Sequence, residues 1–137
     1  MKSINISQLD NGVRIVTERQ SQFESAALGI WIGCGLDKEP DSRVGISHYL
    51  EHMLFKGTKR RTARQISAEI DNLGGHLNGY TERENTCYFV HLLGDYQDTG
   101  ADVLLDMVFN SLMDRDAVET EREVIVQEIR RLEDNPE

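Results

Sequence analysis

Residues 45–58 read GISHYLEHMLFKGT, and this stretch predicts a helix with two chemically different faces. Because an α-helix turns about 100° per residue, His48, Glu51 and His52 fall at roughly 0°, 300° and 40° and share one side. Four apolar residues fall on the opposite side: Ile46, Leu50, Met53 and Leu54. We therefore expect a helix over residues 45–55 that packs by its apolar side and presents two imidazoles and a carboxylate on the other.

Two histidines at positions i and i+4 of a helix can bind one zinc ion through their imidazoles. In this inverted HxxEH order, the glutamate between them reaches the open coordination position of the metal. The same three residues also occur together by chance, and a histidine is more often a packed or exposed side chain than a ligand. The motif alone leaves both readings equally open, and a third ligand has to decide between them.

The last predicted helix offers that ligand, because it carries two glutamates on its apolar face. With Glu121 at 0°, Glu128 falls at about 340°. The neighbouring positions on this face are apolar: Val118, Val124, Ile125, Ile129 and Leu132. Such carboxylates pair with a buried arginine, lie at the frayed edge of the stripe, or face a cation. Beside the helix of His48 and His52, a cation is the economical explanation, with the second glutamate orienting a ligand.

The remaining pattern predicts short strands and helices in an α+β arrangement. Thr62 with Gln65 forms a capping box, Asp116 with Glu119 gives another capping signal, and Pro136 follows the last helix. Strands are expected over residues 4–9, 13–18, 26–33 (a central strand), 76–83 and 85–93. Helices are expected over residues 45–55, 62–74, 95–113 and 116–133. This order predicts an antiparallel sheet with helices packed on one face.

The composition is typical of one globular domain, with 39% hydrophobic and 28% charged residues among 137. The longest apolar stretch, residues 26–34, is too short to span a bilayer, so we expect no membrane partner. A net charge of −9 argues against a nucleic-acid partner and either favours basic or neutral peptides or only keeps the protein soluble. Cys34 and Cys87 form no CxxC pair, and we expect reduced, buried thiols.

Residues 45–58 strongly resemble the signature of the pitrilysin/insulinase zinc metallopeptidases, also called inverzincins. Three further stretches agree with that family: NGVR at 11–14, GGHLNGYTERE at 74–84 and EREVIVQE at 121–128. The separation of Glu128 from His52 is also close to the family's spacing for its third ligand. The family includes the mitochondrial processing peptidase, and this sequence looks closest to its bacterial relatives.

The resemblance implies a zinc-dependent endopeptidase with one Zn²⁺ per chain. His48, His52 and Glu128 would be the metal ligands. Glu51 would be the general base that activates the water, and Glu121 would orient a ligand from the outer shell. The substrate would be a peptide or an unfolded polypeptide.

The resemblance also implies substrate-binding residues around an edge strand. Asn78, Gly79 and Tyr80 match the strand that pairs with the substrate backbone in this family. Family members often have alanine in place of Gly79, and glycine still allows close backbone approach. An ordinary edge strand explains Asn78 and Tyr80 equally well. Phe55, at about 340° on its helix, either walls the pocket beside the metal or packs in the core.

Family members are several times longer than this chain. Residues 1–137 would therefore be an N-terminal zinc-binding peptidase domain, truncated at its C-terminal end, that binds zinc but cleaves peptides poorly. Its partners would be the remaining C-terminal half of the protein and, through the exposed cut surface, further copies of itself. The alternatives are a non-catalytic partner subunit of a processing peptidase complex and another enzyme on a related zinc fold. Residues 1–8 show no signal peptide, which predicts the bacterial cytoplasm, or the mitochondrial matrix if the source is eukaryotic.

Overall fold

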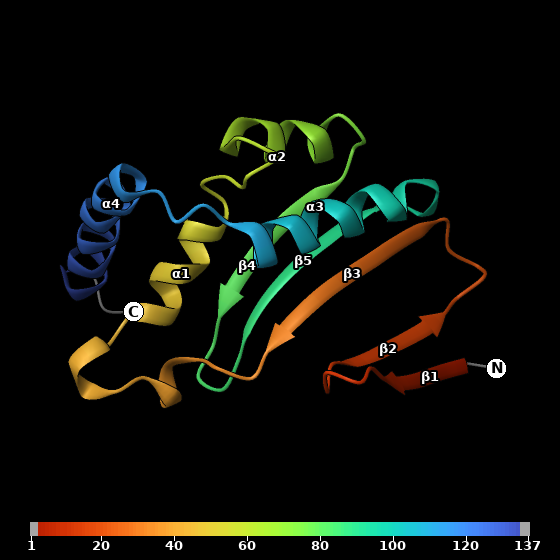
Figure 1. Cartoon of the computed structure of the whole chain (residues 1–137), viewed down its shortest axis with the longest axis horizontal. Coiled ribbons are helices and arrows are strands. Elements are labelled where there is room, and N and C mark those ends of the chain that lie inside the picture. The colour runs from red at the N-terminus through yellow and green to blue at the C-terminus, as the bar shows by residue number, and fades with distance from the viewer. Residues whose placement is uncertain (1–2, 135–137) are drawn as a thin grey trace.

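Residues 3–134, the part of the chain that the computed structural model describes, fold into antiparallel strands and α-helices (Figure 1). The strands are β1 (Ser3–Gln8), β2 (Arg14–Arg19), β3 (Ser25–Ile32), β4 (His76–Thr81) and β5 (Thr86–Leu93). The α-helices are α1 (Ile46–Leu54), α2 (Ala63–Asp71), α3 (Gln97–Asn110) and α4 (Arg115–Asp134). The α+β class is confirmed, and none of the helices described is long and apolar enough to cross a membrane. The predicted stop at Pro136 lies outside the described residues.

The strands pair as a hairpin and a three-stranded sheet. β1 pairs with β2, while β3, β5 and β4 form an antiparallel sheet in that order. β5 is therefore its central strand, and the expectation that residues 26–33 form a central strand is wrong within the described residues. The apolar run of residues 26–33 reflects burial of one face of the strand and not a central position in the sheet. Leu28 and Ile30 pack against the core, whereas Trp31 points to the other face and is 65% exposed.

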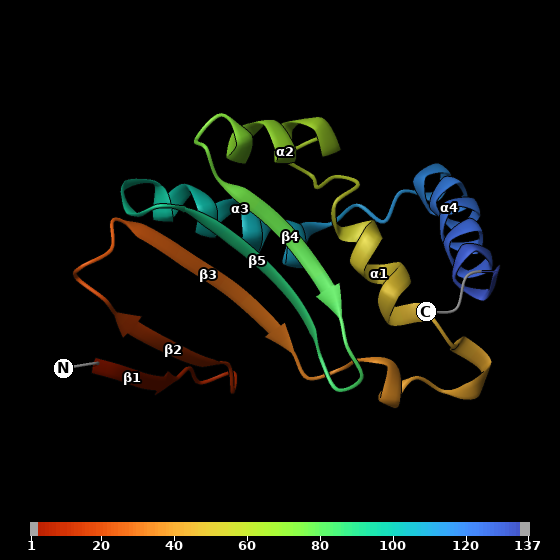
Figure 2. The ribbon, with the colours of Figure 1, turned by 180° about the vertical axis from the view of Figure 1, so that it is seen from behind.

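Two helices, α2 and α3, cover one face of the three-stranded sheet, as the front and back views show (Figures 1 and 2). Alternate residues of β5 point into this layer: Tyr88, Val90 and Leu92. The helices contribute Ile66, Ile70, Val103, Leu104 and Met107. Burial of each such side chain contributes about 1.5–3 kcal/mol. α3 packs tightly on β5 at Gly100, where an added Cβ would lie 2.3 Å from Leu92 Cδ2. The predicted packing of helices on one face is confirmed.

Polar side chains set the starts of α2 and α4. Thr62 Oγ1 accepts a hydrogen bond from Gln65 N at 3.3 Å, and Gln65 Oε1 accepts one from Thr62 N at 2.8 Å, which confirms the capping box. Asp114 Oδ1 accepts from the backbone N–H groups of Asp116 and Ala117 at 3.1 Å each. The predicted cap at Asp116 is therefore wrong. α4 starts one residue earlier, at Arg115, so that Asp116 lies within the first turn, where its own N–H needs an acceptor.

The apolar side of α1 is buried only in its C-terminal half. Met53 and Leu54 are buried, whereas Ile46 and Leu50 are exposed, against the expectation of a continuous core face. The N-terminal half of the helix lies beyond the edge of the sheet, beside α4 (Figure 1).

The apolar stripe of α4 is also buried only in part. Ile125 is buried, but Val124 is exposed. The side chains of Ile129 and Leu132, which the sequence placed on the same stripe, lie outside the described residues.

Both cysteines are free thiols, and they differ in environment. Cys87 in β5 is buried, and burial raises the pKa of its thiol. Cys34 follows β3 and is exposed, so the expectation of burial is wrong for this residue. The loop after β3 leads away from the three-stranded sheet (Figure 1).

An ion-pair cluster around Arg61 fixes the loop between α1 and α2 to α3. The guanidinium contacts Asp102 Oδ2 at 2.6 Å, Glu69 Oε2 at 2.8 Å and Asp106 Oδ2 at 2.9 Å. Thr58 Oγ1 also donates to Asp106 Oδ2 at 2.7 Å. Burial by itself would favour the neutral acid, but the hydrogen bonds from Thr58 and Arg61 lower the pKa of Asp106. The cluster therefore holds a buried charge that depends on Arg61.

Arg61→Ala should lower the free energy of unfolding by about 3 kcal/mol, because it leaves the Asp106 charge buried without its cation. Urea unfolding followed by circular dichroism measures this change. Arg60→Ala is the matched control, since the exposed Arg60 pairs with Asp102 alone and its removal should change little. Equal effects of the two substitutions would contradict the structural role of Arg61.

Candidate metal centre

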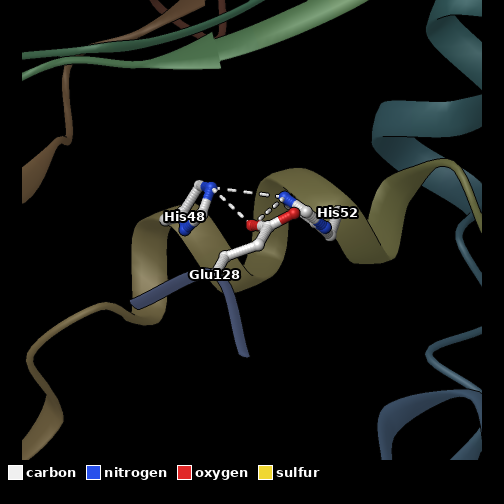
Figure 3. A group of neighbouring side chains, drawn as sticks. All are labelled: His48, His52 and Glu128. Carbon is white, nitrogen blue, oxygen red and sulfur yellow. Dashed lines mark hydrogen bonds and ion pairs between the residues drawn. The ribbon is translucent and has the colours of Figure 1, made fainter. Parts of the chain in front are cut away.

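α1 and α4 lie side by side, and their facing sides bring together the three residues predicted as metal ligands. His48 and His52 project from α1 and Glu128 from α4, and the three side chains point toward one another (Figure 3). The Nε2 atoms of His48 and His52 lie 3.2 Å apart. Glu128 Oε2 lies 3.9 Å from His48 Nε2 and 3.7 Å from His52 Nε2. All three side chains are half-buried, so solvent reaches the group.

These separations suit a single four-coordinate metal ion. Zinc binds imidazole nitrogen and carboxylate oxygen at about 2.0–2.2 Å, so two ligands of a tetrahedral zinc ion lie about 3.3–3.6 Å apart. The observed distances of 3.2–3.9 Å need only small side-chain movements to reach that geometry. Two imidazoles and one carboxylate also leave a fourth position open for water or substrate.

Glu121 lies one heptad before Glu128 on α4 and is 4% exposed. Its Oε1 lies 2.8 Å from His52 Nδ1, and its Oε2 lies 2.5 Å from Lys56 Nζ. Burial opposes ionisation, but the hydrogen bonds from Lys56 and His52 outweigh it and lower the pKa of Glu121. The sequence left open that Glu121 pairs with a buried arginine. The structure instead pairs it with Lys56.

The contact with Glu121 fixes which nitrogen of His52 carries the proton. An ionised carboxylate only accepts hydrogen bonds, so in a neutral His52 the proton is on Nδ1 and the lone pair is on Nε2. That lone pair faces His48 Nε2 and the Glu128 carboxylate. When His48 Nε2 also carries no proton, these three acceptors repel one another unless a cation lies among them. The chemistry of the donor set therefore fits a metal cation.

The first turn of α1 is held by a carboxylate from the preceding loop. The helix starts after Gly45, whose φ of 89° lies in the left-handed region that favours glycine. Glu39 Oε2 accepts a hydrogen bond from Gly45 N at 2.6 Å, and Oε1 accepts one from Ser47 N at 2.7 Å. Burial opposes ionisation here too, but these backbone hydrogen bonds lower the pKa of Glu39. The cap sets the direction of α1 directly before His48.

A second contact joins α1 to α4 one turn before Glu121 along α4. The Tyr49 hydroxyl donates a hydrogen bond to the backbone carbonyl of Val118. Together with Lys56 and His52, Tyr49 fixes the register of the two helices, and this register decides whether Glu128 reaches the histidines.

A groove of about 540 Å³ opens beside the ligand group. Glu51 and His52 of α1 line it with Phe55, the residue after that helix, and with Leu77 and Asn78 of β4. Phe55 lines the groove and also packs against the core, and its contact with substrate stays a prediction.

The other predicted substrate-binding residues lie on β4, which is an edge strand within the described residues. Asn78 and Tyr80 are exposed, and the Gly79 N–H donates a hydrogen bond to Asn78 Oδ1 at 2.9 Å. Asn78 lines the groove, whereas Gly79 and Tyr80 do not. The Tyr80 ring packs near Phe89 on the sheet face that α2 and α3 leave uncovered. The structure therefore brings only Asn78 of these three to the groove.

Four residues around the site were not predicted from the sequence. Lys56 lies two residues beyond the end of α1, where a cationic side chain is common, but its pairing with Glu121 gives no local signal. Thr81, whose hydroxyl donates to Glu51 Oε2 at 2.6 Å, gives no local signal, because its partner is 30 positions away. Glu39 and Tyr49 act through backbone groups outside their own elements, which a sequence pattern does not reveal.

Comparison with known proteins identifies a family. The family model described as "Insulinase (Peptidase family M16)" matches residues 14–137. The chain is 43% identical over 127 residues to the uncharacterized zinc protease YmxG of Bacillus subtilis, covering 93% of this chain and 31% of that protein. It is 41% identical over 128 residues to the probable mitochondrial-processing peptidase subunit beta of Arabidopsis thaliana, covering 93% of this chain and 24% of that protein. The chain thus spans less than a third of the length of either relative.

A solved structure shares the fold. The crystal structure of a protease from Helicobacter pylori superposes on this chain with a TM-score of 0.90 at 24% sequence identity. The match covers 94% of this chain and 31% of that protein. At this identity the likeness supports the fold alone.

Glu39→Ala should lower the free energy of unfolding at pH 7 by about 1–2 kcal/mol, because two backbone N–H groups of α1 lose a charged acceptor. The pKa of Glu39 is lowered in the folded state. Its contribution is therefore complete above the ordinary glutamate pKa of about 4.3 and is lost as the pH falls through the lower folded value. Urea unfolding at a series of pH values should show the difference between wild type and variant shrinking in acid.

Asp41→Ala, in the same exposed loop, is the control and should change little at any pH. A difference for Glu39→Ala that stays constant down to pH 2 would contradict the cap.

Proposed function

The chain belongs to the insulinase family, peptidase family M16, and on that premise we propose that it carries the catalytic zinc site of a zinc-dependent endopeptidase. The observation that carries the proposal is the convergence of His48, His52 and Glu128 at distances that suit one zinc ion. Relatives named as zinc proteases support the choice of metal. Residues 1–137 would form the N-terminal zinc-binding unit of such a peptidase.

His48, His52 and Glu128 would hold one Zn²⁺ in this reaction. A bound zinc ion lowers the pKa of a coordinated water and polarises a carbonyl group. Glu121 keeps the proton of His52 on Nδ1, so that Nε2 remains available as a ligand, and Lys56 compensates the charge of Glu121.

Glu51 would take the proton from the attacking water and deliver it to the leaving amine. Two observations support this role. Glu51 lies between the two histidines on α1, and it lines the same groove as His52. A peptide lying in that groove would therefore pass beside both the ligand group and the carboxylate.

The substrate would be a peptide or an unfolded segment of polypeptide. Its backbone would add to the edge strand β4, and Asn78 and Phe55 would contact it in the groove. A folded protein presents few unpaired strands, so strand addition favours extended substrates.

The 137-residue chain should retain about one zinc per molecule after dialysis, and His48→Ala, His52→Ala or Glu128→Ala should lose it, since each removes a ligand. Elemental analysis of the dialysed proteins measures this content. His76→Ala and His91→Ala are matched controls, because both histidines are exposed on the sheet and lie outside the ligand group. Loss of zinc in the controls, or retention in all three ligand variants, would rule out this site.

Glu51→Gln should retain zinc and reduce peptide hydrolysis by at least about a hundredfold, because the amide cannot accept the proton. The assay uses the full-length gene product and a fluorogenic unstructured peptide, and the 137-residue chain measured alongside should be much slower. A Glu51→Gln variant with near wild-type turnover would remove Glu51 from this role. A zinc-loaded protein that cleaves no peptide would instead support the non-catalytic subunit.

A further inference from the structure

The hydroxyl of Thr81 donates a 2.6 Å hydrogen bond to Glu51 Oε2 and joins β4 to α1 at the groove. From this contact we infer that Thr81 is a positioning residue for Glu51. It holds the carboxylate in the orientation that proton transfer requires. The inference rests on the proposed function, in which Glu51 is the general base.

The contact is the one hydrogen bond that the Glu51 side chain makes among residues 3–134. Glu51 and Thr81 are both half-buried, and α1 packs on β4 at this point. A glutamate side chain has three rotatable bonds, so a carboxylate without a fixed partner would sample many positions. Thr81 therefore provides the main polar restraint on where this carboxylate lies.

The hydrogen bond also distinguishes the two carboxylate oxygens. Oε2 accepts the hydrogen bond from the Thr81 hydroxyl, so Oε1 keeps both lone pairs for the proton of the attacking water. A general base must lie within about 2.6–3.2 Å of the proton-bearing atom, and a misplacement of about 1 Å can reduce the rate roughly a hundredfold. A donor fixed on one oxygen thus affects the rate by placing the other.

Thr81 is also the last residue of β4, the strand proposed to pair with the substrate. Asn78, three residues earlier on the same strand, lines the groove that Glu51 lines. A peptide that adds to β4 would therefore be aligned by the same backbone that holds the base. This arrangement couples substrate register to the position of Glu51 without a further element.

A neighbouring threonine shows what a purely structural contact would look like. Thr86 is the cross-strand partner of Thr81 on β5 and is buried. Its hydroxyl donates to the backbone carbonyl of Cys34 at 2.9 Å, away from the ligand group. Thr86 is therefore a matched control for the loss of a threonine hydroxyl at this end of the sheet.

Thr81→Val in the full-length gene product should lower kcat for an unstructured peptide by about tenfold to a hundredfold, with KM within about twofold and zinc content unchanged. Thr81→Ser, which keeps the hydroxyl, should restore most of kcat. Thr86→Val should lower the thermal midpoint of unfolding without lowering kcat. A Thr81→Val variant with wild-type kcat, a serine variant no faster than the valine variant, or an equal loss of kcat in Thr86→Val would overturn the inference.

A second measurement needs no activity. The metal-free 137-residue chain is unfolded as wild type, Thr81→Val, Glu51→Ala and the double variant. The unfolding equilibrium constant of the double variant should differ about tenfold from the product of the two single effects, the size expected for a hydrogen bond to a charged group. Thr81→Ser should keep this coupling. Additive effects of Thr81→Val and Glu51→Ala would overturn the inference even if the enzyme is active. A wild-type protein that hydrolyses no peptide would refute the proposed function, and the coupling energy would then test the Thr81–Glu51 hydrogen bond by itself.

Discussion

The buried carboxylate of Glu121 sits between α1 and α4 and has to be compensated where it lies, because an unpaired charge in that position would destabilise the fold by several kcal/mol. Of its two partners, His52 lies in the last turn of α1 and Lys56 follows the end of that helix by two residues. Meeting this requirement therefore fixes the register of the two helices and places Glu128, one heptad further along α4, opposite His48 and His52. The same contact fixes the proton of His52 on Nδ1. A single electrostatic constraint thus sets both the geometry of the ligand group and the tautomer of His52.

The remaining structure holds this helix pair against the sheet. Glu39 caps the first turn of α1, and the Arg61 cluster fixes the loop that follows the helix to α3. Thr81 joins the middle of α1 to β4. Each of these contacts uses a polar or charged group that is at least partly removed from solvent, where hydrogen bonds are stronger and leaving them unmade is costly. The ligand group itself stays half-exposed, as access for water and substrate requires.

Local patterns predicted the elements well where one signal dominated. The spacing of His48, Glu51 and His52 predicted one helix face, and Thr62 with Gln65 predicted the start of α2. The strand at residues 26–33 was wrongly predicted to be central in the sheet, because a continuous apolar run also occurs in a strand that is buried on one face only. Residues Thr81 and Glu39 were missed because their partners are distant in sequence and only the tertiary fold brings them together. The two stranded glutamates on α4 were the most informative long-range signal, since a charge on an apolar face requires a partner.

The proposed function depends most on zinc being held by two histidines and a carboxylate between α1 and α4. The zinc K-edge X-ray absorption spectrum of the zinc-loaded 137-residue chain tests this most directly. It should show a shell of nitrogen and oxygen at about 2.0–2.2 Å, with the multiple scattering of two imidazole rings. A zinc–sulfur shell at about 2.3 Å, from Cys34 or Cys87, or a spectrum without imidazole scattering would contradict the account.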